Sequence, residues 1–461
     1  MRQRKLEILI LICPVREPVA EMQHALTLTQ AKVVISEPDR IGTAMAAYPG
    51  VPHVVLTGQP PDGAKTFLNI LRMGEATQPR PDPDTYRAVE LGDRSQHAPV
   101  ILFSSGTTGM PKAVMLRDSS LTLTLANTSA GSSVDEGKAS DAMLLLTSPL
   151  CWFSGVMNLF WSLQTGSTRV FITHSDDLAV LSAIDKYKIT IWVTAPPMLF
   201  TGTAFYKSKS NPGYRLDSLA TIFVGGSGLN AQLEESIEQD VDCRIVQAYA
   251  STETGFICSR SRLKSSASPH GVLGTLSPGV EFRLVDVDTG EDIPTDVKNA
   301  VGEARIRSKY VMLRYCNNPE ETKRAFDEHG FYKTGDLLYE NDEGSYVFVD
   351  RMKEVIKYKN NPISPAELEM VLLQHSGVKE ACVLGRACTA SGELPTAFVS
   401  RADNAAGASL TEDELRAMVA EKLADYKRLR GGVIFLDQLP RTVSGKTDRR
   451  NLKEMLQKIK E

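Results

Sequence analysis

Short apolar runs recur through the first half of the chain and are separated by amphipathic or polar segments. Such runs are typical of strands that are buried on both faces of a sheet. Their alternation with amphipathic stretches predicts an α/β fold, in which ligands bind beyond the carboxyl ends of the strands. The predicted buried strands are residues 32–36, 54–56, 99–103, 189–193 and 221–224.

The pattern changes near residue 277, where alternating polar and apolar positions replace the buried runs. Residues 281–286 and 302–307 have the pattern of paired strands, and Asp288-Thr-Gly290 after the first has the composition of a turn. Residues 346–349 form a further predicted strand. We therefore expect a large α/β domain with several subdomains and a β-rich portion over residues 1–349.

A compact α+β segment follows Asp350, where we place the domain boundary. Ser364-Pro-Ala-Glu367 has the form of a helix capping box, with proline at the first helical position, and predicts a helix through His375. Thr411-Glu-Asp-Glu414 repeats the pattern, and residues 433–436 form a predicted strand. These elements predict a small C-terminal α+β domain over residues 350–461.

Residues 142–168 carry no charged side chain, as a membrane span would. Pro149, Gly155 and Asn158 interrupt the run, so we expect a buried strand followed by a helix that lines a cavity. The start of the chain is basic and then apolar like a signal peptide, but its apolar core is short. We predict a cytoplasmic protein without a transmembrane segment. A peroxisomal location stays open as the alternative, although the terminal Lys-Ile-Lys-Glu lacks the peroxisomal Ser-Lys-Leu signal.

Composition narrows the functional classes. The 461 residues are 42% hydrophobic and 23% charged, which is ordinary for a globular protein. A net charge of −4 gives no electrostatic basis for nucleic-acid binding. The seven cysteines are scattered singly, so neither a zinc site nor a disulfide framework is expected.

The segment Phe103-Ser-Ser-Gly-Thr-Thr-Gly-Met-Pro-Lys112 directly follows a predicted strand. A loop rich in hydroxyls and glycines can wrap its donors around an anion, and the lysine adds positive charge, so polyphosphate is the ligand that suits it best. It is no Walker A motif, because Met110 and Pro111 separate the last glycine from Lys112 and Ala113 follows.

Four further motifs follow in order along the chain. They are Tyr249-Ala-Ser-Thr252-Glu253-Thr, Tyr332-Lys-Thr-Gly-Asp336, the charged passage from Asp350 to Lys357, and Pro440-Arg-Thr-Val-Ser-Gly-Lys446. Each alone is a weak signal, since a charged residue in a turn is usually just solvated. Together and in this order they are specific. From about Cys13 to its end, the chain resembles the adenylate-forming superfamily of acyl-CoA synthetases, 4-coumarate–CoA ligases and firefly luciferases.

The resemblance implies an acid–thiol ligase that uses ATP and Mg²⁺ and then coenzyme A, and it implies that the C-terminal domain is mobile. Asp336 and Arg351 would bind the ribose, Thr252 the α-phosphate, and Glu253 the Mg²⁺ ion. Lys446 would bridge the attacking carboxylate and the α-phosphate. The other nucleotide-binding residues implied are Ser104, Ser105, Gly106, Thr107, Thr108, Gly109 and Lys112 on the β- and γ-phosphates, and Gly225, Gly226, Ser227 and Tyr249 around the adenine.

Thioester formation would follow a rotation about the hinge residue Asp350, which replaces Lys446 by the face that carries Lys357. Trp152 takes the position of an aromatic gate beside the acid, although a plain core role competes. The absence of Asp and Glu from residues 142–168 argues against an amino-acid substrate and favours an apolar acid, fatty or aryl.

The chain departs from the family pattern in several places. Fewer residues precede its phosphate loop than in family members, which predicts an N-terminal truncation that lowers stability and turnover. In addition, Asn360 stands where the thioester-forming face usually has glycine. Two alternatives therefore stay open beside the ligase. They are a luciferase-type oxygenase that acts on the adenylate, and a truncated non-catalytic homologue that binds nucleotide or a partner. Which acid is used and the oligomeric state are also left open.

Overall fold

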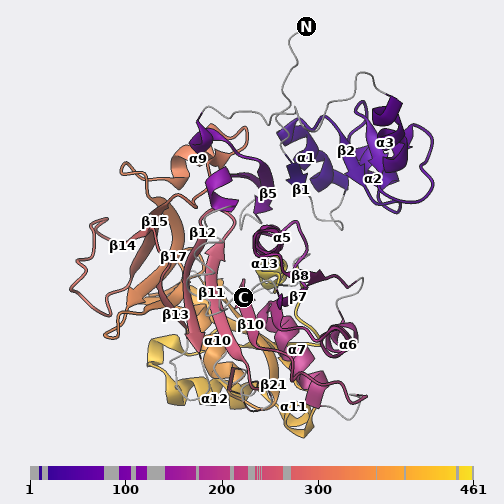
Figure 1. Cartoon of the computed structure of the whole chain (residues 1–461). Coiled ribbons are helices and arrows are strands. Elements are labelled where there is room, and N and C mark those ends of the chain that lie inside the picture. The colour runs from indigo at the N-terminus through magenta and orange to yellow at the C-terminus, as the bar shows by residue number, and fades with distance from the viewer. Residues whose placement is uncertain are drawn as a thin grey trace.

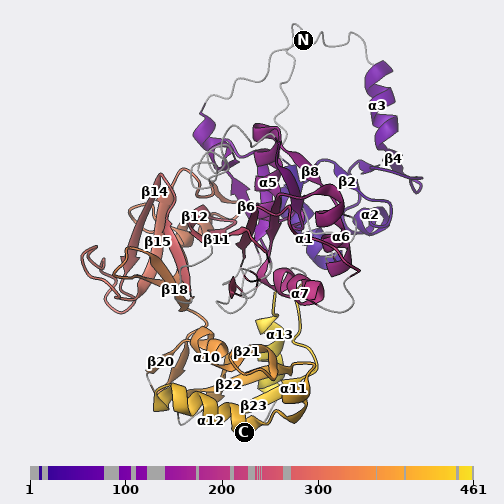
Figure 2. The same cartoon turned by 60° about the horizontal axis from the view of Figure 1, so that its bottom comes forward.

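The computed structural model describes most of the chain in three regions, an N-terminal region, a large sheet with its helices and a small C-terminal domain (Figures 1 and 2). The residues described are 10–12, 19–76, 93–104, 111–121, 141–172, 176–207, 212–226, 234–235, 237, 239, 241–262, 271–359, 361–388, 391–442 and 446–458.

An 11-stranded mixed sheet forms the centre of the molecule. One half is parallel, as the buried apolar runs predict, with the order β8 (Thr168–Val170), β7 (Met143–Leu146), β9 (Ile191–Thr194), β10 (Thr221–Gly225) and β11 (Arg244–Ser251). The other half is antiparallel, with the order β12 (Gly255–Arg262), β13 (Val272–Leu276), β18 (Tyr346–Arg351), β17 (Tyr332–Glu340), β15 (Gly302–Ser308) and β14 (Val280–Val285).

Helices cover both faces of the parallel half. The helix α5 (Phe153–Thr165) packs on the side of Leu144, whereas α6 (Asp177–Tyr187) and α7 (Pro196–Lys207) pack on the side of Leu145. Alternate residues of one strand point to opposite faces, so β7 is apolar throughout because both faces are covered. This arrangement confirms the α/β prediction and the strand and helix expected over residues 142–168. No helix in the described part of the chain is long and apolar enough to cross a membrane.

The hydroxyl-rich loop does follow a buried strand. That strand, β5 (Val100–Ser104), pairs antiparallel with β6 (Lys112–Leu116), and β1 (Ile10–Ile12) and β16 (Arg314–Tyr315) complete this four-stranded sheet. The loop therefore joins the two strands of a hairpin. A Walker A loop would open a helix instead, so the topology agrees with the exclusion of that motif.

The N-terminal region contains a three-stranded parallel sheet of β2 (Val34–Ser36), β3 (His53–Val55) and β4 (Ala64–Thr66), with α1 (Val19–Thr29), α2 (Ile41–Ala47) and α3 (Phe67–Ala76). None of the residues of α3 is buried, and its apolar side chains from Phe67 to Met73 are largely exposed. Further along the chain, η1 (Arg94–Gln96) is a single 3₁₀ turn.

The small domain is a five-stranded sheet covered by helices. Its strands are β19 (Ile356–Tyr358), β20 (Asn361–Ile363), β21 (Val378–Cys388), β22 (Gly392–Arg401) and β23 (Val433–Leu436). Its helices are α10 (Pro365–Leu373), α11 (Ala405–Ser409), α12 (Glu412–Lys422), η3 (Asp425–Lys427) and α13 (Arg449–Lys458). Because β18 belongs to the large sheet and β19 to the small one, we propose that the domain boundary lies near Asp350.

The predicted helix caps are confirmed, with one difference in length. Ser364 accepts a hydrogen bond from the Glu367 N–H and Thr411 accepts one from the Glu414 N–H. The first helix ends at Leu373 and not at His375, because the N–H groups of Gln374 and His375 bond three residues back and tighten the last turn. Glu367 does not bond back to the cap but pairs with Lys427.

Candidate active site

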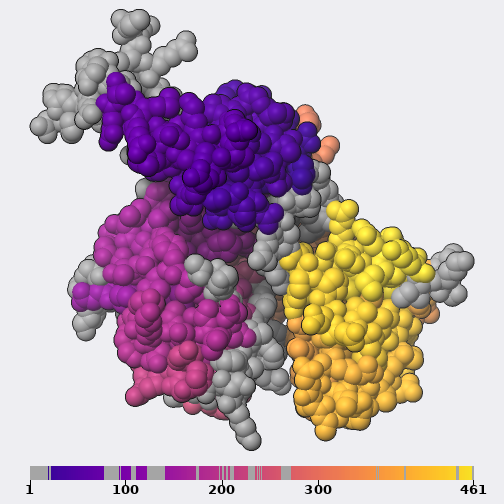
Figure 3. Space-filling model, turned by 90° about the vertical axis from the view of Figure 1, so that its right-hand side faces the viewer, coloured from indigo at the N-terminus to yellow at the C-terminus, as the bar shows by residue number. Residues whose placement is uncertain are grey.

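A cleft of about 2400 Å³ opens between the carboxyl ends of the large sheet's strands and the small domain. Figure 3 shows the small domain, in yellow and orange, across a furrow from the helices of the large domain in magenta. The cleft brings together most of the site residues predicted from the sequence. Its lining includes Ser104, Lys112, Trp152, Gly225, Gly226, Tyr249, Thr252, Glu253, Asp336, Asp350, Arg351 and Lys446.

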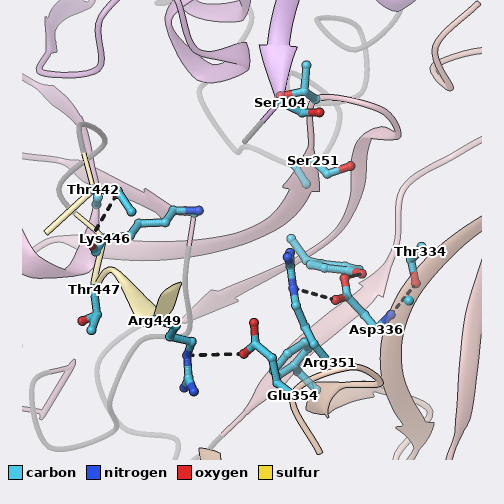
Figure 4. A pocket seen from close by; sticks show the side chains of 18 of the residues that line it. Ser104, Ser251, Thr334, Asp336, Arg351, Glu354, Thr442, Lys446, Thr447 and Arg449 are labelled. Carbon is cyan, nitrogen blue, oxygen red and sulfur yellow. Dashed lines mark hydrogen bonds and ion pairs between the residues drawn. The ribbon is translucent and has the colours of Figure 1, made fainter. Parts of the chain in front are cut away.

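Asp336 is the buried carboxylate of the cleft, with 6% of its surface exposed. Its Oδ2 accepts the Tyr249 hydroxyl at 2.6 Å, and the Nε of Arg351 lies 3.1 Å from its Oδ1 (Figure 4). Arg351 is placed there by register, since it pairs directly with Asp336 across β17 and β18. Burial raises the pKa of Asp336, against the opposing effect of Arg351. Burial, followed by the nearby carboxylate, raises the pKa of Tyr249 well above its usual value.

A tight turn between β11 and β12 presents Thr252 and Glu253. The hydroxyls of Ser251 and Thr254 lie 2.8 Å apart and close this turn. Gly255 ends it at a φ of +69°, where a Cβ would also lie 2.9 Å from the Cβ of Tyr310, so glycine is required there. Ser251, Thr254 and Gly255 therefore hold the turn that carries Thr252 and Glu253.

Glu253 lies beside the phenol of Tyr315. The Tyr315 hydroxyl donates to Glu253 Oε1 at 3.4 Å, which is a long hydrogen bond. Burial, and then the negative charge of Glu253, raise the pKa of Tyr315. Tyr315 lies 62 positions from Glu253 along the chain, and no pattern in the sequence linked it to the carboxylate.

Lys446 enters the cleft from the small domain, just before α13. Its Nζ lies 5.8 Å from the centroid of the Trp152 ring, and a Cβ on Gly226 would lie 3.9 Å from its Cε. In Figure 4 its ammonium group and the Asp336–Arg351 pair face the same space. Although the side chain reaches solvent, desolvation by the cleft walls and the like charge of Arg351 lower the pKa of Lys446.

Lys112 forms an ion pair with Glu321 of α9 (Pro319–Ala325), and its Nζ lies 5.0 Å from the centroid of the Tyr315 ring. That pairing holds the pKa of Glu321 below its usual value. No sequence motif pointed to Glu321, because its partner is 209 positions away. The remaining residues of the predicted phosphate and adenine sites, Ser105, Gly106, Thr107, Thr108, Gly109 and Ser227, lie outside the described residues, as do Asn360 and Gly445.

Lys357 is not part of the cleft lining. It lies on β19 with its side chain exposed, and its backbone N–H donates to Glu393 at 2.9 Å. The structure thus presents Lys446 to the cleft and Lys357 to solvent, the arrangement that the resemblance implies for adenylation.

The sequence also did not indicate a half-buried cluster around Arg449, at the start of α13. Arg449 pairs with Glu369 at 2.6 Å and with Glu354 at 3.3 Å, and it donates to the Val383 carbonyl at 3.0 Å. Burial raises the pKa of Glu369 to about 6, against the opposing charge of Arg449. The cluster ties the segment after Asp350 to the sheet and helices of the small domain.

Asp350 joins the two domains through hydrogen bonds and is 3% exposed. Its Oδ2 accepts the Ser364 hydroxyl and the Ala366 N–H, the latter at 3.1 Å, so it caps α10 of the small domain from β18 of the large sheet. Its Oδ1 accepts the N–H of Arg351 at 2.7 Å.

Replacing Asp350 by alanine should lower the free energy of unfolding by about 1–2 kcal/mol, the usual effect of removing a helix cap. Urea unfolding followed by circular dichroism measures the change. Asp350→Asn keeps an acceptor oxygen and should lose less, and Thr411→Ala, which uncaps α12, gives a reference loss in the same domain. An Asp350→Ala protein as stable as the parent would contradict this role.

Comparisons with known proteins identify the family of the chain. The family model of AMP-binding enzymes matches residues 8–316, and that of their C-terminal domain matches residues 367–446. The 4-coumarate–CoA ligase 1 of Oryza sativa subsp. japonica is 30% identical over 449 residues, which are 96% of this chain and 77% of that protein. The 4-coumarate–CoA ligase of Vanilla planifolia is 33% identical over 398 residues, which are 85% of this chain and 69% of that protein.

Solved structures resemble the whole fold. ATP-bound MatB from Rhodopseudomonas palustris superimposes with a TM-score of 0.80 at 22% identity, over 96% of this chain and 82% of that one. The family resemblance and the enzyme class predicted from the motifs, an acid–thiol ligase, are confirmed at the level of the family. The chain belongs to the AMP-binding, adenylate-forming enzymes.

Proposed function

We propose that the protein activates a carboxylic acid with ATP to give an acyl-adenylate and pyrophosphate, and then transfers the acyl group to coenzyme A. The observation that supports this most strongly is the convergence in one cleft of a buried carboxylate, Asp336, with Lys446 from the other domain. No protein nucleophile is needed, because the substrate carboxylate itself attacks phosphorus.

The nucleotide end of the cleft fits a nucleoside. Among the described residues, no donor forms a hydrogen bond with Asp336 Oδ1, although Arg351 lies beside it as an ion-pair partner. A buried acceptor of this kind suits a ribose hydroxyl. The phenol ring of Tyr249 lines the same part of the cleft and would stack on the adenine, with Gly225 and Gly226 at its edge.

The chemical step joins two anions, so positive charge between them lowers the barrier. Lys446 would contact the attacking carboxylate oxygen and the α-phosphate, and Thr252 would donate to the α-phosphate. As the new carbon–oxygen–phosphorus bridge forms, the bond to the β-phosphate breaks and pyrophosphate leaves. Ser104, Lys112 and the loop between them would hold the departing β- and γ-phosphates.

Glu253 would hold Mg²⁺ together with phosphate oxygens. Mg²⁺ is commonly bound by one or two carboxylates plus substrate phosphates, so the single carboxylate of this turn fits the ion. The described residues contain no group of three or more possible metal ligands, so most of the ligands would come from ATP and water. When bound, the ion neutralises charge on the phosphates.

Glu253→Gln should raise the Mg²⁺ concentration for half-maximal pyrophosphate exchange by about tenfold, as a loss of about 1.4 kcal/mol of binding energy would produce. A neutral amide is a poorer ligand for a hard cation. The measurement is a Mg²⁺ titration of exchange at saturating ATP. Glu343→Gln, an exposed surface change, is the matched control, and equal titrations for both variants would place the metal elsewhere.

The acyl end of the cleft favours an apolar acid, fatty or aryl. Beyond Trp152, its lining includes Met157 and Trp161 of α5 and Val193 and Phe223 of the sheet. Apolar walls bury an alkyl or aromatic acid without leaving a charge unpaired. The likeness to 4-coumarate–CoA ligases, as those relatives are named, also supports an aryl acid.

Transfer to coenzyme A would follow a rotation of the small domain about Asp350. The rotation withdraws Lys446 and brings the face with Lys357 to the cleft. The coenzyme A thiol then attacks the acyl carbonyl carbon, and AMP leaves.

The proposal is tested by ATP–pyrophosphate exchange over a panel of fatty and aryl acids, followed by mass spectrometry of the thioester after addition of coenzyme A. We expect exchange and thioester with the same apolar acids. Acid-dependent exchange without thioester, accompanied by oxygen uptake, would support a luciferase-type oxygenase. An absence of exchange with every acid, while nucleotide still binds, would support a non-catalytic nucleotide-binding protein.

A further inference from the structure

The contact between Lys446 and Trp152 is made across the two domains. Trp152 precedes α5 of the large domain, whereas Lys446 precedes α13 of the small one. An ammonium group 5.8 Å from an indole centroid is within the range of a cation–π attraction. The contact exists only while the small domain presents Lys446 to the cleft.

A hydrogen-bonded turn holds the backbone of Trp152 in its place. The Trp152 N–H donates to the Pro149 carbonyl and the Trp152 carbonyl accepts the Val156 N–H, both at 3.1 Å. A Cβ on Gly155 would lie 2.2 Å from the Pro149 carbonyl oxygen, so this close turn depends on glycine. The backbone that carries the ring is therefore held by hydrogen bonds within the large domain, independently of any substrate.

The backbone of Lys446 is also held by hydrogen bonds. The Lys446 carbonyl accepts the Thr442 N–H at 2.8 Å and the Thr442 hydroxyl at 3.2 Å. An isolated β-bridge between Arg441 and Thr447 closes the base of this loop. The backbone at Lys446 is thus held within the small domain. Its side chain extends from there to the ring of Trp152 and to Gly226.

Among the described residues, the charged groups around the Lys446 ammonium group leave it without a carboxylate of its own in the cleft other than Asp336. Arg351 of β18 repels Lys446, while Asp336 of β17 attracts it but is already bound by Arg351 and Tyr249. Lys353, whose own pKa is lowered by burial and by Arg351, is a further cation in the cleft lining. The face of Trp152 supplies negative potential next to the lysine without adding a competing carboxylate.

We propose that Trp152 is a positioning residue for adenylation, which holds the Lys446 ammonium group through a cation–π contact and thereby favours the small-domain orientation that forms the acyl-adenylate. This inference rests on the proposed reaction. The proposed role differs from that of a gate or wall of the acid pocket, because the electron-rich face of the Trp152 ring acts on Lys446 of the other domain.

The test compares Trp152→Leu with the parent in pyrophosphate exchange as a function of pH. Loss of a partly exposed cation–π contact should slow exchange about 2- to 5-fold at saturating acid and ATP. The ring favours the charged lysine, so its removal should move the alkaline limb of the profile to lower pH by about 0.3–0.7 unit. Trp152→Phe, which keeps an aromatic face, should show smaller changes in both.

A second arm needs no turnover, so it separates failure of this inference from failure of the proposed function. The chain has three tryptophans, and Trp161→Phe with Trp192→Phe leaves Trp152 as the only one, so that excitation selective for tryptophan reports on it alone. Its fluorescence should change as Lys446 loses its proton, and Lys446→Met should abolish that transition. If the two core substitutions impair folding, the difference between the parent and Lys446→Met emission titrations gives the same comparison.

Phe171→Leu is the matched control, since it removes an exposed aromatic ring that contacts Arg169 outside the cleft lining. It should leave the rate and the alkaline limb unchanged. If Trp152→Leu has the parent's alkaline limb and the emission of Trp152 does not respond to Lys446→Met, the ring is only a wall of the acid pocket and the inference is wrong.

Discussion

Lys446→Ala should lower the rate of acyl-adenylate formation by about 10²–10³-fold, the usual effect of removing one group that stabilises transition-state charge. The reason is electrostatic, since Lys446 is a cation of the small domain that faces the same space as the Asp336–Arg351 pair and would lie between two anions that must meet. Acid-dependent pyrophosphate exchange measures the step. Thioester formation from a supplied acyl-adenylate should be largely intact, because in the proposed reaction that step would use the other face of the small domain.

The comparison needs a lysine of the same domain outside the cleft. Lys379 pairs with Asp403 on the surface, so Lys379→Ala should exchange like the parent. Equal exchange rates for Lys446→Ala and the parent would remove Lys446 from the chemical step. A variant that loses both half-reactions equally would indicate a folding defect, which circular dichroism would reveal.

Asp336→Ala should raise the ATP concentration for half-maximal exchange by about 10- to 10²-fold, because a hydrogen bond to a charged group contributes about 1.5–3 kcal/mol. The side chain is 6% exposed and its Oδ1 accepts no hydrogen bond from the described residues, so it would accept from the ribose. The measurement is an ATP titration of exchange at saturating acid.

Two further variants locate the effect. Asp336→Asn keeps one acceptor oxygen and should bind ATP better than Asp336→Ala, while Asp342→Ala on the surface should match the parent. The AMP dissociation constant should rise in parallel with the ATP requirement, since both nucleotides have the same ribose. An unchanged ATP titration for Asp336→Ala would place the nucleotide elsewhere.

Much of the fold follows from local sequence pattern. The apolar runs predicted β5, β9 and β10 because strands covered on both faces have few polar positions. The caps at Ser364 and Thr411 were also predictable, since they depend on residues three positions apart. The order of the 11 strands was not, because β13 pairs with β18 through Val272 and Val347, residues far apart in the sequence that no single turn connects.

The site divides in the same way. Tyr249, Glu253, Asp336 and Lys446 could be named because each lies in a short motif. The contacts of Glu321, Tyr315 and Ser364 with Lys112, Glu253 and Asp350 could not be predicted, because the fold alone brings these residues together. The contact of Lys446 with Trp152 joins residues of different domains, and no local pattern encodes it.

The measurement that tests the central claim most directly follows an oxygen atom. The acid is supplied with both carboxylate oxygens labelled as ¹⁸O, together with ATP and coenzyme A, and the AMP formed is analysed by mass spectrometry. If the carboxylate attacks the α-phosphate in this cleft, one ¹⁸O atom passes into each AMP and one stays in the thioester carbonyl. AMP without label, or ADP as the nucleotide product, would contradict the formation of an acyl-adenylate.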